Sequence, residues 1–293
     1  MSILDLSALP APQVLEPLDF EALYQGKLAM FRQHMGEAWT ADLESDPVTK
    51  QLELSAYGDL QLRARINDAA KALLLAHARD ADLDHLAANV KLKRLVIRPA
   101  DPQAVPPVEE VKESDDALRE RVQLAYEGLT TAGPRNSYIL HARNASALVA
   151  DAEAESPAPA CVTVTVLSLD GDGKASAELL ATVAAALNDE NVRPLGDRVT
   201  VQSAQVLPYR IDAVLYMKGP GPESDAALAE ARRKLAAWIN PRRRLGVEVA
   251  RSAIDAQLHV AGVARVDLSN WRDIAPTRAQ AAYCTGYSVT LGG

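Results

Sequence analysis

The sequence predicts an α+β protein, in which an N-terminal helical bundle region precedes split βαβ, ferredoxin-like layers of helices on a mixed sheet. Helical periodicity dominates the first half of the 293-residue chain, whereas strand-like and helix-like runs alternate in the second half. A chain of this length is expected to hold more than one module. We expect an N-terminal arm with a helical core-bundle region (1–98), a linker with a helical middle region (99–158), and a C-terminal α+β part (159–293).

The longest predicted helix lies within residues 44–90, which are typical of one long helix, a break and a short second helix of residues 83–88. Ser45 or Asp46 can cap its start, and Pro47 suits the first helical position. Five apolar residues then recur at steps of four and three and form a stripe along one helical face: Leu62, Ile66, Ala69, Leu73 and Ala76. A wide apolar surface on so long a helix needs more than one neighbour, so we predict a partner interface here.

The segment before this helix contains an extended arm and a first helix. Residues 1–18 are punctuated by prolines, and an arm that docks on a neighbouring subunit is favoured over a frayed tail. Asp19 is expected to cap a helix of residues 20–34.

The middle of the chain is bounded by two proline-rich pieces, residues 99–107 and 156–160. Between them, acidic residues after Ser114 open a helix that Gly128 ends, and Pro134 begins another that reaches about Asn144.

The C-terminal part alternates strands with amphipathic helices. The expected strands are residues 162–169, 199–201, 209–217, 263–268 and 283–291, and the expected helices are residues 177–187, 225–239 and 252–259.

Composition excludes several classes of protein. The formal net charge of −8 argues against binding of nucleic acid or an anionic membrane by the whole chain. Two isolated cysteines, Cys161 and Cys284, allow no disulfide framework, and both are expected to be buried small hydrophobes. No run approaches the ~20 apolar residues of a membrane span, and no signal peptide is recognised. We therefore expect a protein that is made in the cytoplasm and is used there or carried out within a particle.

No catalytic, cofactor-binding or metal-binding residues are predicted. Residues 170–174 (DGDGK) match a calcium loop and a phosphate loop only incompletely, so a tight turn in which glycines supply positive φ is favoured. Asp82, Asp84 and His85 form a conceivable acid/base cluster, but the acids are more simply explained as helix caps beside a solvent-facing histidine.

The strongest charge feature joins residues 232–234 (RRK) with Arg242, Arg243 and Arg244. A solvated face or an interface with an acidic partner subunit is favoured over a nucleic-acid patch, because acids lie nearby and few aromatic residues are interleaved.

Several separated blocks resemble the baseplate J family of contractile-tail phages and R-type phage-tail-like bacteriocins (tailocins). The blocks are MSILDLSALPAPQVLEPLDFEAL at the N-terminus, ESDP with AYGDLQLRARINDAAKALLLAHARDADLDHLA, ESDDALRERVQLAYEGLTTAGPRNSYILHA from Glu113, VRPLGDRVTVQSA at 192–204 and HVAGVARVDL at 259–268. The chain departs from the family pattern at Asp80 and Ala100, where glycines are expected.

This resemblance implies a structural, non-enzymatic component of the baseplate wedge. Two copies would bind one smaller baseplate I-type protein, helices of all three chains would form a bundle, and C-terminal domains would pair between wedges into a ring around the central spike. The ring would contact hub and sheath-initiator proteins and relay the contraction trigger to the sheath. Assembly would occur in the bacterial cytoplasm, and the product would be a virion or tailocin. Alternatives are a soluble α+β enzyme or ligand-binding protein with an unfamiliar site, and a nucleic-acid-binding factor that uses residues 232–244.

Overall fold

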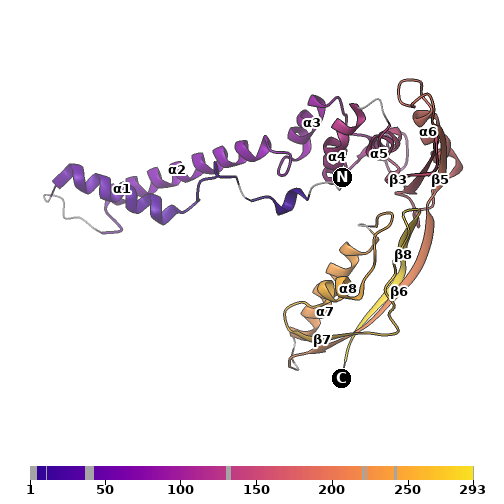
Figure 1. Cartoon of the computed structure of the whole chain (residues 1–293). Helices are drawn as coiled ribbons and strands as arrows, with labels where there is room; N and C mark the ends of the chain where they lie inside the picture. Colours follow the sequence, from indigo (N-terminus) through magenta and orange to yellow (C-terminus); the bar gives the residue numbers. More distant parts are fainter. Residues whose placement is uncertain are drawn as a thin grey trace. The chain divides into compact units, whose positions relative to one another are not determined.

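The computed structural model describes residues 5–10, 12–36, 43–129, 133–219, 221, 223–240 and 243–292 (Figure 1). Its contacts divide the chain into two compact units. The N-terminal unit comprises Ser2–Lys93 and Asp115–Val122, and the C-terminal unit comprises Arg94–Ser114 and Gln123–Gly293. Helices and mixed sheets are both present, so the predicted α+β class is confirmed.

The N-terminal unit is helical in its described residues. Its elements are η1 (Leu6–Ala8), α1 (Phe20–Met35), α2 (Pro47–Ala72), α3 (Asp80–Asn89) and most of α4 (Asp115–Leu124). The predicted caps of the first two helices are confirmed: the side chain of Asp19 accepts from the Ala22 N–H, and that of Asp46 accepts from the Val48 N–H. Each cap satisfies one N–H that a helix start leaves without an intrahelical partner.

Helix α2 ends earlier than the sequence predicts. Leu73 is its C-cap, and Ala76 lies in the turn that follows, so only three members of the predicted stripe are helical. Helix α3 begins at Asp80 and not at Leu83, and no side chain caps its start. The prediction that Asp82 and Asp84 act as caps is therefore wrong, because both carboxylates lie inside the helix.

A small apolar core joins α3 and α4 within the N-terminal unit. Its buried members are Ala78, Leu83, Ala87, Leu118 and Val122. Leu83 and Leu118 are fully buried, and they lie on helices separated by a long stretch of sequence. Helix α4 thus belongs to the core of a unit from which its neighbours in sequence, on both sides, are excluded.

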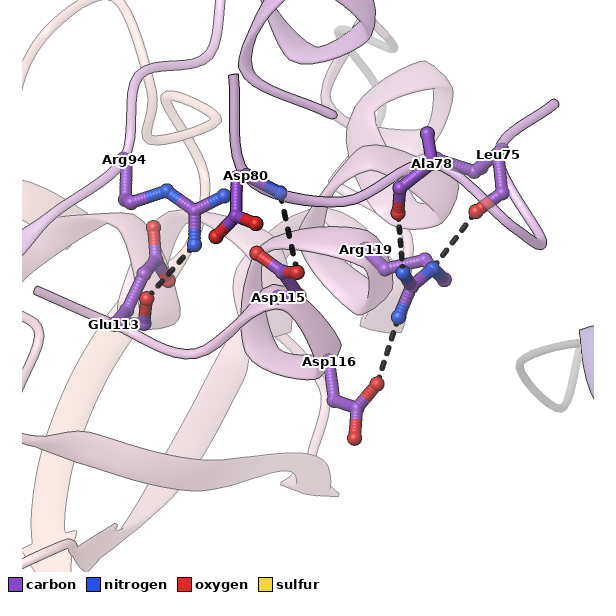
Figure 2. A network of polar contacts seen from close by, with 8 residues as sticks. All are labelled: Leu75, Ala78, Asp80, Arg94, Glu113, Asp115, Asp116 and Arg119. Atoms are coloured by element: carbon purple, nitrogen blue, oxygen red, sulfur yellow. Dashed lines mark hydrogen bonds and ion pairs between the residues drawn. The ribbon is translucent and has the colours of Figure 1, made fainter. Parts of the chain in front are cut away.

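The C-terminal unit begins with a short hairpin of β1 (Val96–Arg98) and β2 (Val111–Lys112). Glu113 fastens its open end: the carboxylate accepts from the Leu95 N–H at 2.8 Å, and the main-chain carbonyl accepts from Arg94 Nη1 at 2.9 Å (Figure 2). The proline-rich stretch of residues 99–107, which the sequence marks as a boundary, lies in the connection between its two strands.

The first larger sheet is mixed and has the order β3-β4-β5. Its strands are β3 (Val149–Ala158), β4 (Cys161–Ser168) and β5 (Arg198–Ser203), and η3 (Ala125–Leu129), α5 (Arg135–Ala145) and α6 (Ala177–Leu187) lie beside them in the sequence. Strand β3 pairs antiparallel with β4, and β5 pairs parallel with β4. Apolar residues of α5 and α6 pack on one face of this sheet, including Tyr138, Leu179 and Val183.

Strand β3 was not predicted from the sequence. It carries alanines on the buried face and Asp151, Glu153 and Glu155 on the other, and these residue types have low strand propensity. Pairing with the β-branched strand β4 forms it nonetheless. The boundary expected between residues 158 and 159 falls in the turn of this hairpin.

The second larger sheet is also mixed and has the order β7-β6-β8. Its elements are β6 (Gln205–Met217), α7 (Glu223–Trp238), α8 (Arg251–Leu258), β7 (Val263–Leu268) and β8 (Gln280–Leu291). Strand β6 pairs antiparallel with β7 and parallel with β8. Both helices contribute to one large buried cluster with the sheet, in which Ile211, Leu215, Leu235, Ile254 and Leu258 are fully buried. The predicted layering of helices on mixed sheets is confirmed, with the strands divided between two three-stranded sheets.

Candidate assembly surface

Helices α1 and α2 form a pair that buries little of its own apolar surface. Leu28 of α1 and Ala56 of α2 are the buried apolar residues of the two helices in the part of the chain that the structure describes. An ion pair of 2.6 Å between Lys27 Nζ and Asp59 Oδ2 also joins them. Helix α2 has 26 residues. It is therefore about 39 Å long, and much of its surface has no neighbour within the described chain.

The predicted stripe on α2 is exposed. Leu62 is 62% exposed, Ile66 is 52% exposed and Leu73 is 75% exposed. Ala69 is also exposed, and Ala76 is partly buried. At about 100° per residue, the helical members Leu62, Ile66 and Ala69 lie roughly 110° around α2 from the buried Ala56. These three residues therefore share an exposed side of α2, whereas Leu73 is its C-cap and Ala76 lies in the turn that follows.

A second group of exposed apolar residues lies in the first half of α2 and on α1. Leu54 is 68% exposed, Tyr57 is 51% exposed, and Met30 of α1 is 61% exposed. Leu54 and Tyr57 project from α2 on a different side from Leu62 and Ile66. Exposed apolar residues on more than one side of a helix indicate more than one neighbour.

The N-terminal arm is anchored on α2 within the same chain. The buried side chain of Asn67 accepts from the Glu16 N–H at 2.9 Å and donates to the Glu16 carbonyl at 2.8 Å. Arg63 forms an ion pair of 3.0 Å with the Glu16 carboxylate. This contact with its own chain was not foreseen from the sequence, because an asparagine inside an amphipathic helix has no pattern that reveals its distant partner. Residues 1–4 of the arm lie outside the described residues.

The turn between α2 and α3 is held by side chains of α4 (Figure 2). Arg119 donates to the carbonyl of Leu75, to the carbonyl of Ala78 and to the carboxylate of Asp116, each at 2.7 Å. Asp115 accepts from the Asp80 N–H at 3.2 Å. Hydrogen bonds from a guanidinium are stronger than neutral ones, so this network fixes the path of the chain where α2 ends.

The described part of the basic cluster makes contacts within the C-terminal unit. Arg243 Nη2 donates to the carbonyls of Ser168 and Leu169, and its guanidinium lies 5.4 Å from the centre of the Tyr283 ring. Arg244 Nη1 donates to the carbonyl of Arg243 at 3.1 Å. Arg242 lies outside the described residues. Arg243 and Arg244 therefore fasten the chain locally, and a role for them toward a partner stays a prediction.

Asp151 of strand β3 also forms a hydrogen bond with the segment that follows Arg244. Its carboxylate accepts from the Leu245 N–H at 3.0 Å and from its neighbour Ala152 at 2.9 Å. Loss of solvent raises the pKa of Asp151 above its ordinary value, although the nearby guanidinium groups of Arg244 and Arg143 oppose this shift. Asp151 and Leu245 thus tie the first sheet to the segment that precedes α8.

The residues considered for catalysis or ligand binding lie on several different elements. His85 is exposed on α3, as expected. Cys284 is buried, and burial raises the pKa of its thiol, whereas Cys161 is only partly buried, contrary to the prediction that both are buried. The DGDGK segment is a turn with Gly171 at φ 58° and Gly173 at φ 104°, as predicted. Within the described residues, no three His, Cys, Asp or Glu side chains gather as potential metal ligands.

No helix among the described residues has the length and apolar character needed to cross a bilayer.

Comparison with known proteins shows that the chain matches one protein family along its length. Residues 44–101 match the baseplate J-like N-terminal domain, and residues 130–203 match the baseplate J-like central domain. Baseplate protein J of Escherichia phage P2 is 48% identical over 300 residues, which cover 100% of this chain and 99% of the relative. The similarity runs through both units, including α4, which lies between the two matched domains. The chain belongs to the baseplate J family.

Proposed function

We propose that this protein is a structural component of a contractile-tail baseplate, in which two copies join one smaller I-type protein to form a wedge unit. The observation that carries the proposal is the apolar surface that α2 leaves uncovered, with Leu62, Ile66 and Leu73 each more than half exposed. The 48% identity with baseplate protein J of phage P2 supports the same role. No step in this function needs a catalytic group.

The energetics of the α1–α2 pair favour partner helices. Burying a leucine or isoleucine side chain stabilises a protein by roughly 1.5–3 kcal/mol. Leu54, Leu62, Ile66 and Leu73 contribute little of this in the single chain, because they remain exposed. Helices from other subunits that cover them gain several kcal/mol, which offsets part of the entropy cost of association. Two sides of α2 offer such residues, which suits a bundle with more than one added helix.

The C-terminal unit has a different part in the proposed assembly. Its two sheets carry well-buried cores, which suits a domain that moves as a body and pairs with its counterpart in the next wedge. Six such units would ring the central spike, contact hub and sheath-initiator proteins, and pass the contraction signal to the sheath. The assembled particle would be a virion or a tailocin, built in the bacterial cytoplasm.

Native mass spectrometry of the chain co-expressed with the small proteins of its gene neighbourhood tests this proposal. We expect a complex of two copies of this chain with one smaller protein. The Leu62→Asp variant should abolish that complex, because a carboxylate replaces an apolar group in the interface. His85→Asp is the control: His85 is also exposed but lies on α3, away from both apolar sides of α2, so its complex should form normally.

Two results would count against the wedge role. A monomer that ignores every neighbouring gene product excludes the complex altogether. Equal assembly of the Leu62→Asp and His85→Asp variants excludes the stripe as the interface, even if the complex exists.

A further inference from the structure

The break between α2 and α3 lies in a stretch whose residues favour a helix. Residues 73–79 (LLLAHAR) contain no glycine, proline or β-branched residue, and leucine, alanine and arginine are strong helix formers. The chain is nonetheless irregular there. The Leu74 N–H donates to the carbonyl of Lys71 and the His77 N–H to that of Leu74, both three residues back, whereas an α-helix bonds four residues back. The Ala78 N–H makes one bond of the α-helical kind, to the carbonyl of Leu74. Local sequence therefore does not explain the break.

One face of α4 supplies the contacts that impose it. Asp115, Leu118, Arg119 and Val122 follow the spacing i, i+3, i+4, i+7 and so lie on one side of that helix. Leu118 and Val122 pack with Ala78 and Leu83, which lie on either side of the start of α3. Arg119 binds the carbonyls of Leu75 and Ala78 inside the break. In a continuous helix those carbonyls would instead accept from backbone N–H groups one turn later.

The start of α3 is also held in an unfavourable conformation. Asp80 has φ 46°, in the left-handed region that residues with a side chain seldom adopt. Its N–H donates to Asp115 of α4. In a continuous helix Asp80 would return to the ordinary right-handed region, so the strain at Asp80 opposes the break.

The position of α4 in the chain connects this break with the rest of the protein. Arg94–Ser114 and the chain from Gln123 onward belong to the C-terminal unit, whereas α4 up to Val122 belongs to the N-terminal unit. Tension on either end of α4 therefore acts directly on the residues that hold the break.

We propose that α4 is a latch on the long helix. While α4 is seated, α2 and α3 are separate; when α4 is withdrawn, residues 73–79 become helical and α2 continues into α3. Withdrawal costs the apolar contacts of Leu83 and Leu118, which keeps the seated form dominant in the free protein. The latch gives the C-terminal unit a route to change the direction and length of the α2 arm. It is a property of this chain and does not depend on the composition of the wedge.

Hydrogen exchange of the full-length protein, followed by mass spectrometry, tests the latch. The Leu118→Ala/Arg119→Ala variant removes the apolar and polar holds together. We expect the amides of Leu75, Ala76, His77 and Arg79 to exchange about tenfold more slowly in this variant, because each then donates to the carbonyl four residues back, as Ala78 already does in the seated form. If Arg119 and Leu118 merely stabilise a turn, the same amides will exchange faster, and the proposal is overturned. The opposite signs separate the two roles.

A glycine substitution at Asp80 provides the reverse test. Adding Asp80→Gly to the double variant relieves the positive φ of the seated form and disfavours the helix, so the gain in protection should fall by about fivefold. Unchanged protection in the triple variant would show that no helix had formed across the break. Arg233→Ala, which removes an exposed ion pair with Glu230 on α7, is the control and should leave residues 75–79 unaffected. If the double variant fails to fold, Arg119→Ala alone carries the test, with slower exchange expected and faster exchange overturning the latch.

Discussion

The α1–α2 pair and the α7–α8 layer contain helices of similar kind, yet they bury apolar residues very differently. In the α7–α8 layer, Leu235, Ile254 and Leu258 are fully buried against the sheet. On α2, Leu62, Ile66 and Leu73 are each more than half exposed. The first region obtains its stability from its own chain. The second carries apolar surface whose stabilising effect is realised only when other chains cover it, which is the physical signature of an assembly element.

The largest loss of stability is expected from a substitution in the buried core of the C-terminal unit. Leu235→Ala removes a fully buried side chain and leaves a cavity among Leu215, Ile254 and their neighbours. We expect the free energy of unfolding of this unit to fall by roughly 2–5 kcal/mol. Urea denaturation followed by tryptophan fluorescence measures it, since Trp238 and Trp271 pack against this core. A loss below that of Leu62→Ala would contradict the contrast between the regions.

The arm anchor on α2 is expected to have an intermediate effect. Asn67→Ala removes two hydrogen bonds to Glu16, which should destabilise the packed arm by about 1–3 kcal/mol. Limited proteolysis should then cut residues 5–18 at lower protease concentration. Asp68→Ala, at an exposed position next to Asn67, should leave the cleavage rate unchanged. Equal cleavage of the wild type and Asn67→Ala would show that the anchor does not hold the arm.

The β3–β4 turn offers a stabilising change. Ala160 has φ 60°, which glycine adopts without the penalty of a Cβ. We expect Ala160→Gly to raise the free energy of unfolding by about 0.5–1 kcal/mol. Ala158→Gly, in strand β3, should lower it by a similar amount. Thermal denaturation of the two variants measures the difference, and a shift of the same sign in both would refute the strain at Ala160.

The tie between the first sheet and Leu245 predicts a pH dependence. The pKa of Asp151 is raised in the folded protein, so protonation of this carboxyl favours the folded state. The ionised carboxylate lowers the free energy of unfolding. This loss is recovered as pH falls through the folded-state pKa of Asp151 toward the ordinary value of about 3.9. The stability of the wild type relative to Asp151→Asn should therefore rise from pH 7 to pH 4. A constant difference over that range would exclude the effect.

The smallest expected change in the free chain is at the stripe itself. Leu62→Ala should alter the free energy of unfolding by less than about 0.5 kcal/mol, because the side chain is already 62% exposed. Urea denaturation followed by far-UV circular dichroism measures this change, because Leu62 lies on a helix of the N-terminal unit, whereas Trp238 and Trp271 report on the C-terminal unit. A large loss would mean that Leu62 already has a partner within the free chain, and that the stripe is not a surface reserved for other subunits.

The sequence by itself determined the features that depend on residues close together along the chain. Apolar periodicity defined the length of α1, the start of α2 and the stripe of Leu62, Ile66 and Ala69. Caps at Asp19 and Asp46, and the glycine turn at 170–174, follow from local chemistry in the same way.

Only the tertiary structure decided the features that depend on distant partners. Strand β3 forms because β4 pairs with it, although its own residues do not favour a strand. Helix α2 stops at Ala72 because Arg119 and Leu118, more than forty residues later, hold the following turn. The role of Asn67 appears only when Glu16 lies beside it. Local propensities differ by less than 1 kcal/mol per residue, so a few buried contacts and charged hydrogen bonds outweigh them.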